Sequence, residues 1–140
     1  MNGSPPKKRV LFVCTHNSAR SHMAEGLMNS LLGDRYEATS AGTEPSEVNP
    51  NAASVLLEIG IDISHHRSKH INELLDQDFD SVVTVCDHAR ETCPVFPGGK
   101  ELIHHGFVDP ASVTGTELER QAAFRRIRDE IRSWIATEFV

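Results

Sequence analysis

Short apolar runs alternate with helical patterns along the chain. Residues 9–13 place Val, Leu, Phe and Val in succession without polar alternation, which is typical of a strand buried on both faces. Residues 36–41 and 81–85 predict two further strands, and residues 101–105 predict a weaker fourth. Helical spacing is found over residues 18–32, 50–59 and from about 115 to the end, with a short helical stretch at 71–75.

Local signals mark the ends of these helices. Asn49 is placed to cap the second helix, Pro50 suits its first position, and Gly60 follows its last turn. Gly33 follows the first helix, whose expected inward face carries Met23, Leu27 and Leu31. The inward stripe expected for the last helix consists of Ala123, Phe124, Ile127, Ile131, Trp134 and Ile135.

Strands that alternate with helices indicate parallel pairing, because each parallel connection has to cross a face of the sheet. We therefore expect a doubly wound α/β sheet with helices on both faces, formed by a single domain over residues 9–140. Residues 1–8 are expected to form a flexible leader. Ligands of such sheets bind beyond the carboxyl ends of the strands, and Cys14 and Cys86 both directly follow predicted strands.

Composition narrows the class of protein. The chain has 140 residues and a net charge of −6, which argues against general binding of nucleic acid. It has no apolar run long enough to span a bilayer and no apolar signal core near its start, so a cytoplasmic protein is expected, with no membrane partner. We expect a monomer. An odd count of three cysteines in a reducing compartment favours chemistry over a disulfide framework.

The sequence Cys-Thr-His-Asn-Ser-Ala-Arg lies between a predicted strand and a predicted helix. Its backbone N–H groups and the helix N-terminus favour a bound anion, and Arg20 offers a planar fork to two anion oxygens. The same positive field is expected to make Cys14 a thiolate at neutral pH. The alternative is a buried core cysteine beside a surface arginine. The expected oxyanion-binding residues are Thr15, His16, Asn17, Ser18, Ala19, Arg20 and Ser21.

Three further residues are candidates for chemistry. Asp109 precedes Pro110, a pair that is often no more than a turn but that also places a carboxyl group in a loop. Cys86 and Cys93 are separated by six residues, too many for an ordinary zinc pair with His88. A redox pair fits this spacing better, and two packing cysteines remain the alternative. No metal site and no cofactor are expected.

The segment from Val10 to Leu27, with "SAG" at 40–42, Asn-Pro at 49–50 and "GIDIS" at 60–64, resembles the low-molecular-weight protein tyrosine phosphatase family. It is most similar to the thioredoxin-coupled arsenate reductase branch. The resemblance covers nearly the whole chain and implies a flavodoxin-like three-layer fold with a four-stranded parallel sheet in the order 2-1-3-4. It also implies that Asp109 is the general acid. The phosphatases follow this Asp-Pro with tyrosines, whereas Ala111 and Ser112 follow it here.

The resemblance further implies a relay of three cysteines. Cys14 attacks arsenate, which phosphate or sulfate can mimic, and a Cys14–Cys86 disulfide then forms and passes to Cys86–Cys93, where thioredoxin reduces it. The alternative is a phosphatase that hydrolyses phosphomonoesters through a phosphocysteine. Some relatives bind potassium near the loop, but Lys69 stands where one of the ligands is expected, so no bound potassium is predicted.

Overall fold

The computed structural model of the chain describes residues 6–86 and 99–139. Its sheet has four parallel strands, β1 (Lys8–Cys14), β2 (Tyr36–Gly42), β3 (Ser81–Thr84) and β4 (Leu102–His104). The strand order is β2-β1-β3-β4, which confirms the expected order of a flavodoxin-like α/β fold. The strand at the centre is β1, and its residues 10–13 are fully buried because both faces of the sheet are covered there.

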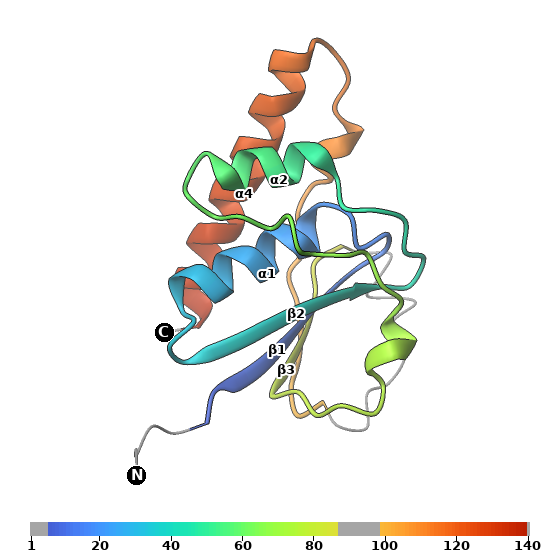
Figure 1. Cartoon of the computed structure of the whole chain (residues 1–140), viewed down its shortest axis with the longest axis vertical. Coiled ribbons are helices and arrows are strands. Elements are labelled where there is room, and N and C mark those ends of the chain that lie inside the picture. Colours follow the sequence, from blue (N-terminus) through green and yellow to red (C-terminus); the bar gives the residue numbers. More distant parts are fainter. Residues whose placement is uncertain (1–5, 87–98, 140) are drawn as a thin grey trace.

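In the part of the chain that the structure describes, the α-helices lie on one side of this sheet (Figure 1). Helix α1 (Arg20–Leu31) packs on β1 and β2, while α2 (Pro50–Leu57) and α4 (Glu117–Glu138) pack on α1 and on each other. The connection from β2 to β3 contains α2 and then the short 3-10 helix η1 (Ile71–Leu74), which lies on the opposite side of the sheet from α1. Among the residues that the structure describes, no helix is long and apolar enough to cross a membrane.

The predicted helix signals are used as expected. Asn49 accepts a hydrogen bond from the Asn51 backbone N–H at the start of α2, and Gly60 takes a positive φ of 83° after it. The predicted inward face of α1 is correct for Met23 and Leu27 but wrong for Leu31, which is 44% exposed. Leu31 is in the last turn of α1, beyond the area that the neighbouring helices cover.

The register of the sheet brings the functional segments together. Cys14 pairs with Gly42 of β2, and Val13 pairs with Thr84 of β3. The Val85 backbone N–H then donates to the Val13 carbonyl over 2.9 Å, so the chain after β3 continues beside the end of β1. The carboxyl ends of three neighbouring strands therefore lie side by side at one edge of the sheet, where such folds bind ligands.

Candidate active site

The loop that follows β1 is held in place through its carbonyl oxygens. The carbonyls of Thr15, His16 and Ser18 accept hydrogen bonds from the backbone N–H groups of Glu44, Ser46 and Asn49, respectively. Because a trans peptide points its N–H opposite to its carbonyl, the N–H groups at positions 16, 17 and 19 face away from that segment. Successive N–H groups turned to one side form a concave anion-binding nest.

The N-terminus of α1 adds to this positive field. Ala19 occupies the cap position without a side-chain hydrogen bond, and the first turn contains no acidic residue. By contrast, α4 begins with a complete capping box between Thr116 and Glu119. The unpaired N–H groups and the positive end of the α1 dipole are therefore left for an anion at the loop.

The Asn17 side chain stabilises the loop through hydrogen bonds. Asn17 has a left-handed φ of 46°, a conformation that asparagine tolerates better than most residues. Its Nδ2 group donates to the hydroxyls of Ser21 and Ser40 over 2.9 and 3.0 Å, and its Oδ1 accepts from the Lys69 backbone N–H over 2.9 Å. Ser21, in the first turn of α1, thus helps to fix the Asn17 side chain.

Gly42 permits the close approach of β2 to the same loop. A Cβ atom at this position would lie 2.7 Å from the Thr15 carbonyl oxygen and 2.8 Å from the Asn17 nitrogen. Real Cβ atoms do not approach backbone atoms so closely, so any larger residue would push the loop away from β2. This contact explains why a glycine ends β2 at the site.

Arg20 reaches across the mouth of the site. Its Nη1 group donates to the Phe107 carbonyl over 3.0 Å, and its Nη2 group lies 3.7 Å from Asp109 Oδ2. Its Nε atom is buried and has no hydrogen-bond partner among the described residues, so this donor fits an anion oxygen. The cavity beside it measures about 340 Å³ and is lined by Thr15, His16, Arg20, Glu44 and Asp109.

The structure brings two of the three cysteines together. Cys14 and Cys86 are both buried, with 3% and 5% of their surface exposed, and their side chains are in hydrogen-bond contact. Thr15 Oγ1 lies 3.2 Å from Cys86 Sγ and helps to hold it there. Cys93, the third cysteine predicted from the sequence, lies outside the described residues, as does His88.

The protonation state predicted for Cys14 is wrong for this arrangement. The hydrogen bond to Cys86, followed by burial, raises the pKa of Cys14, and these effects outweigh the Arg20 charge and the Thr15 backbone, which lower it. Cys14 is therefore held as a thiol at neutral pH while Cys86 rests against it. The prediction failed because it considered the loop alone, whereas the largest influence comes from the end of β3.

We expect Cys86→Ala to make Cys14 more reactive at neutral pH. The Cys86 hydrogen bond raises the Cys14 pKa, so its removal lowers that pKa and increases the thiolate fraction at every pH below it. The measurement is the rate of iodoacetamide alkylation of Cys14 against pH, followed by mass spectrometry of its peptide. The rate should rise at a lower pH in this variant than in wild type. Cys93→Ala controls for loss of a thiol elsewhere in the sequence, and an unchanged profile in Cys86→Ala would contradict the assignment.

Asp109 lies at the same mouth, on the segment that follows β4. Its Oδ1 atom accepts a hydrogen bond from the Ala111 backbone N–H over 2.9 Å and thereby caps the 3-10 helix η2 (Pro110–Ser112). The Asp-Pro pair is therefore a turn and a site residue at once, with its side chain 43% exposed. Glu44 and the Phe107 carbonyl also lie at this site, and they were not predicted because no local sequence pattern marks either of them.

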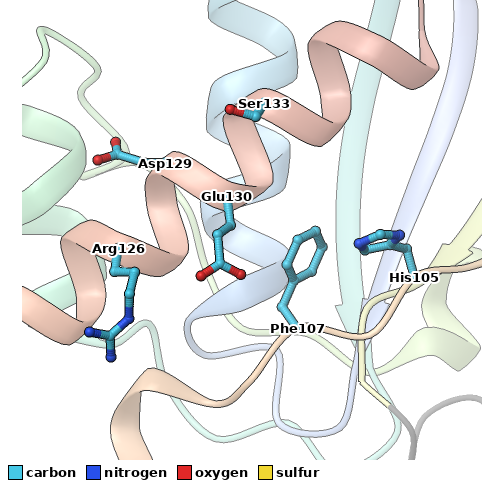
Figure 2. Close-up of a pocket in the computed structure, with 6 residues that line it drawn as sticks. All are labelled: His105, Phe107, Arg126, Asp129, Glu130 and Ser133. Atoms are coloured by element: carbon cyan, nitrogen blue, oxygen red, sulfur yellow. The ribbon is translucent and has the colours of Figure 1, made fainter.

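A larger cavity of about 650 Å³ lies elsewhere, between α4 and the segment that follows β4 (Figure 2). Figure 2 shows Glu130 of α4 extending toward Phe107 in this cavity. Its lining residues are His105, Phe107, Arg126, Asp129, Glu130 and Ser133. This lining contains no residue of the loop that follows β1. The smaller cavity is lined by Thr15 and His16 of that loop together with Arg20, so it is the candidate active site.

The fold and the loop together define a class: α/β proteins in which a cysteine and an arginine enclose a backbone nest for a tetrahedral anion. The family model described as low molecular weight phosphotyrosine protein phosphatase matches residues 9–137. The chain belongs to that family. It is also 51% identical over 131 residues to an arsenate reductase of Halalkalibacterium halodurans, covering 94% of each chain.

Solved structures with this fold include reductases. An arsenate reductase in the phosphate binding state has a TM-score of 0.75 and 30% identity, with 93% of this chain and 95% of that chain covered. A thioredoxin-dependent arsenate reductase of Corynebacterium glutamicum has a TM-score of 0.65 and 28% identity. That comparison covers 97% of this chain and 64% of the other.

Proposed function

We propose that the protein is an arsenate reductase that converts arsenate to arsenite through a relay of Cys14, Cys86 and Cys93, with thioredoxin as the reductant. The observation that carries this proposal is the hydrogen-bond contact between Cys14, which directly precedes the anion-binding loop, and Cys86. A phosphatase needs one thiol, which water later releases. A second thiol in contact with the first is required when the two sulfurs form a disulfide during the reaction.

The first step is attack by the Cys14 thiolate on arsenic. The loop N–H groups and the Arg20 guanidinium hold the three oxygens that stay on arsenic, where charge develops during the attack. Asp109 donates a proton to the departing hydroxyl, which leaves as water, and a sulfur–arsenic(V) bond forms. Because the Cys86 hydrogen bond raises the Cys14 pKa, that hydrogen bond has to open and Cys14 has to pass its proton to an oxygen of the bound arsenate before this step.

The second step is the redox step. The Cys86 thiolate attacks Cys14 Sγ, a sulfur–sulfur bond forms, and the sulfur–arsenic bond breaks with its electron pair left on arsenic. Arsenic(V) thereby becomes arsenic(III), and two thiols become one disulfide. Cys14 ends β1, and Cys86 is two residues beyond the end of the paired strand β3. This proximity lowers the entropic cost of bringing the two sulfurs together.

The last steps restore Cys14. The Cys93 thiolate attacks Cys86 Sγ, which releases the Cys14 thiolate and leaves a Cys86–Cys93 disulfide. A thioredoxin dithiol then reduces this disulfide by the same exchange chemistry. The thioredoxin-dependent relative supports this choice of reductant.

Counting thiols tests the relay. The reduced chain, with three thiols, is treated with excess arsenate without thioredoxin, and free thiols are titrated before and after. We expect wild type to lose two thiols and to release one arsenite. Cys93→Ser should also lose two thiols, but its disulfide should map to Cys14–Cys86. Retention of all three thiols in wild type, with continued turnover of aryl phosphate, would favour the phosphatase.

Asp109→Asn tests the acid. Asparagine keeps the oxygen that caps η2 but donates no proton to the leaving hydroxyl, so the single-turnover rate of thiol loss should fall about 100-fold. Stopped-flow mixing of reduced protein with arsenate measures this rate. Asp129→Asn, on α4 at the other cavity, is the matched control and should leave the rate unchanged. An equal fall in both variants would remove Asp109 from the mechanism.

A further inference from the structure

Three side chains that the relay does not use converge beside α1. His22 and Glu25 belong to α1, and His66 comes from the segment between α2 and η1. His22 is fully buried, and the side chains of His66 and Glu25 are 4% and 13% exposed. Histidine and carboxylate groups gathered away from water are unusual unless they serve each other or a ligand.

The polar atoms of this cluster face one another. His22 Nδ1 lies 3.0 Å from His66 Nδ1, and His66 Nε2 lies 3.2 Å from Glu25 Oε2. One ligand atom from each residue lies within 4.8 Å of the others. A tetrahedral zinc ion with bonds of about 2.0 Å holds its ligand atoms about 3.3 Å apart, so the largest separation in this set has to shorten by at most about 1.5 Å for the three atoms to bind one ion.

The histidines are in the form that binds metals. Burial, then the charge interaction with His66 and then Lys69, lower the pKa of His22 to about 3. Burial, then His65 and then Lys69, lower the pKa of His66 to about 4. Both rings are therefore neutral at pH 7, with lone pairs available. His22 Nε2 is also buried without a hydrogen bond of ordinary geometry in the described part of the chain.

Glu25 connects the cluster to the oxyanion loop. The Ser40 hydroxyl donates to Glu25 Oε1 over 2.6 Å, while Asn17 Nδ2 donates to the same hydroxyl oxygen. Glu25 Oε2 is on the histidine side, so a metal there leaves the Ser40 contact in place to orient the carboxylate. The Lys69 charge acts on Glu25 and on both histidines, and it is the cation with which a metal ion has to compete.

We propose that His22, Glu25 and His66 bind a divalent transition metal of the Zn²⁺ class, with water as the fourth ligand. Two imidazoles and one carboxylate suit such ions and not Mg²⁺ or Ca²⁺, which prefer oxygen ligands. Bound metal would fix Glu25 and, through Ser40 and Asn17, stiffen the loop around Cys14.

Cobalt(II) is the probe, because its absorption reports its ligands. Reduced full-length protein is titrated with Co²⁺ in the absence of arsenate. We expect one equivalent to give the visible absorption of a tetrahedral nitrogen and oxygen site without the near-ultraviolet sulfur-to-cobalt band that the cysteines would produce. His66→Gln should weaken binding at least about 100-fold, because losing a ligand exceeds the effect of losing an outer partner. His105→Gln, at the other cavity, should bind like wild type.

Thermal unfolding with a chelator present shows whether each variant is folded before the titration. A spectrum dominated by the sulfur band, or equal Co²⁺ affinity in His66→Gln and wild type, would overturn the proposal. Absence of any tetrahedral spectrum at about 1 mM Co²⁺ would overturn it as well, with Lys69 then left as the resident cation of the Glu25 pocket. None of these outcomes depends on arsenate reduction, so the site and the proposed function are tested separately.

Discussion

Cys86→Ser should abolish arsenite production while leaving intact the residual hydrolysis of aryl phosphate that we expect because reductases and phosphatases of this family share the anion loop. The serine hydroxyl fits beside Thr15, but it cannot attack Cys14 sulfur to form a disulfide, so arsenic(V) on Cys14 has no source of electrons. The loop amides, Arg20 and Cys14 remain in place for phosphoryl transfer. Arsenite release in the presence of thioredoxin should therefore fall to background, and p-nitrophenyl phosphate turnover should stay within a few-fold of wild type.

The same variant also separates the two roles of Cys86. Because Cys86 raises the Cys14 pKa, the serine variant should hydrolyse aryl phosphate at least as fast as wild type at neutral pH. Cys14→Ser is the reference that loses both activities, since both begin at that sulfur. Arsenite production by Cys86→Ser at an appreciable fraction of the wild-type rate would show that another thiol or an external reductant takes its place.

Arg20→Ala should lose both activities together, by about 1,000-fold or more in kcat/KM. Removing a single donor to a developing oxyanion in other enzymes costs 10²–10³-fold, and Arg20 supplies a full charge as well as a fork of donors. Its loss also frees the Phe107 carbonyl and Asp109, which it holds at the mouth of the site. Steady-state kinetics with arsenate and with aryl phosphate measure both losses.

Two arginine variants make this result specific. Arg20→Lys keeps the charge without the planar fork, so it should recover only part of the activity. Arg126→Ala, at the cavity beside α4, should retain both activities and controls for the loss of a positive charge. Equal activity in Arg20→Ala and Arg126→Ala would place the anion elsewhere.

The local elements were predictable because their signals are short. An uninterrupted apolar run predicted β1, Asn49 and Pro50 marked the start of α2, and Gly60 marked its end. Cys14 and Arg20 flank one loop between a strand and a helix, so seven residues of sequence were enough to predict an anion site. The strand order followed from the family resemblance, and the register in the structure agrees with it.

Contacts between distant segments could not be predicted in this way. The Cys14 pKa is governed first by Cys86, which belongs to the end of a different strand, so analysis of the loop gave the wrong protonation state. His22 and His66 are 44 residues apart, and no ligand spacing joins them until α1 packs beside the segment that follows α2. The close approach at Gly42 likewise exists only once β2 pairs with β1.

The sequence by itself determined the elements, the anion loop and the residue types available for chemistry, because propensity, capping and backbone geometry act over a few neighbouring residues. The family resemblance indicated Cys86 as the partner of Cys14, but the tertiary structure alone decided how the Cys14 proton is held and which histidines share a buried carboxylate. These properties depend on desolvation and on charges a few ångströms away, and only the packing of strands and helices brings those groups together.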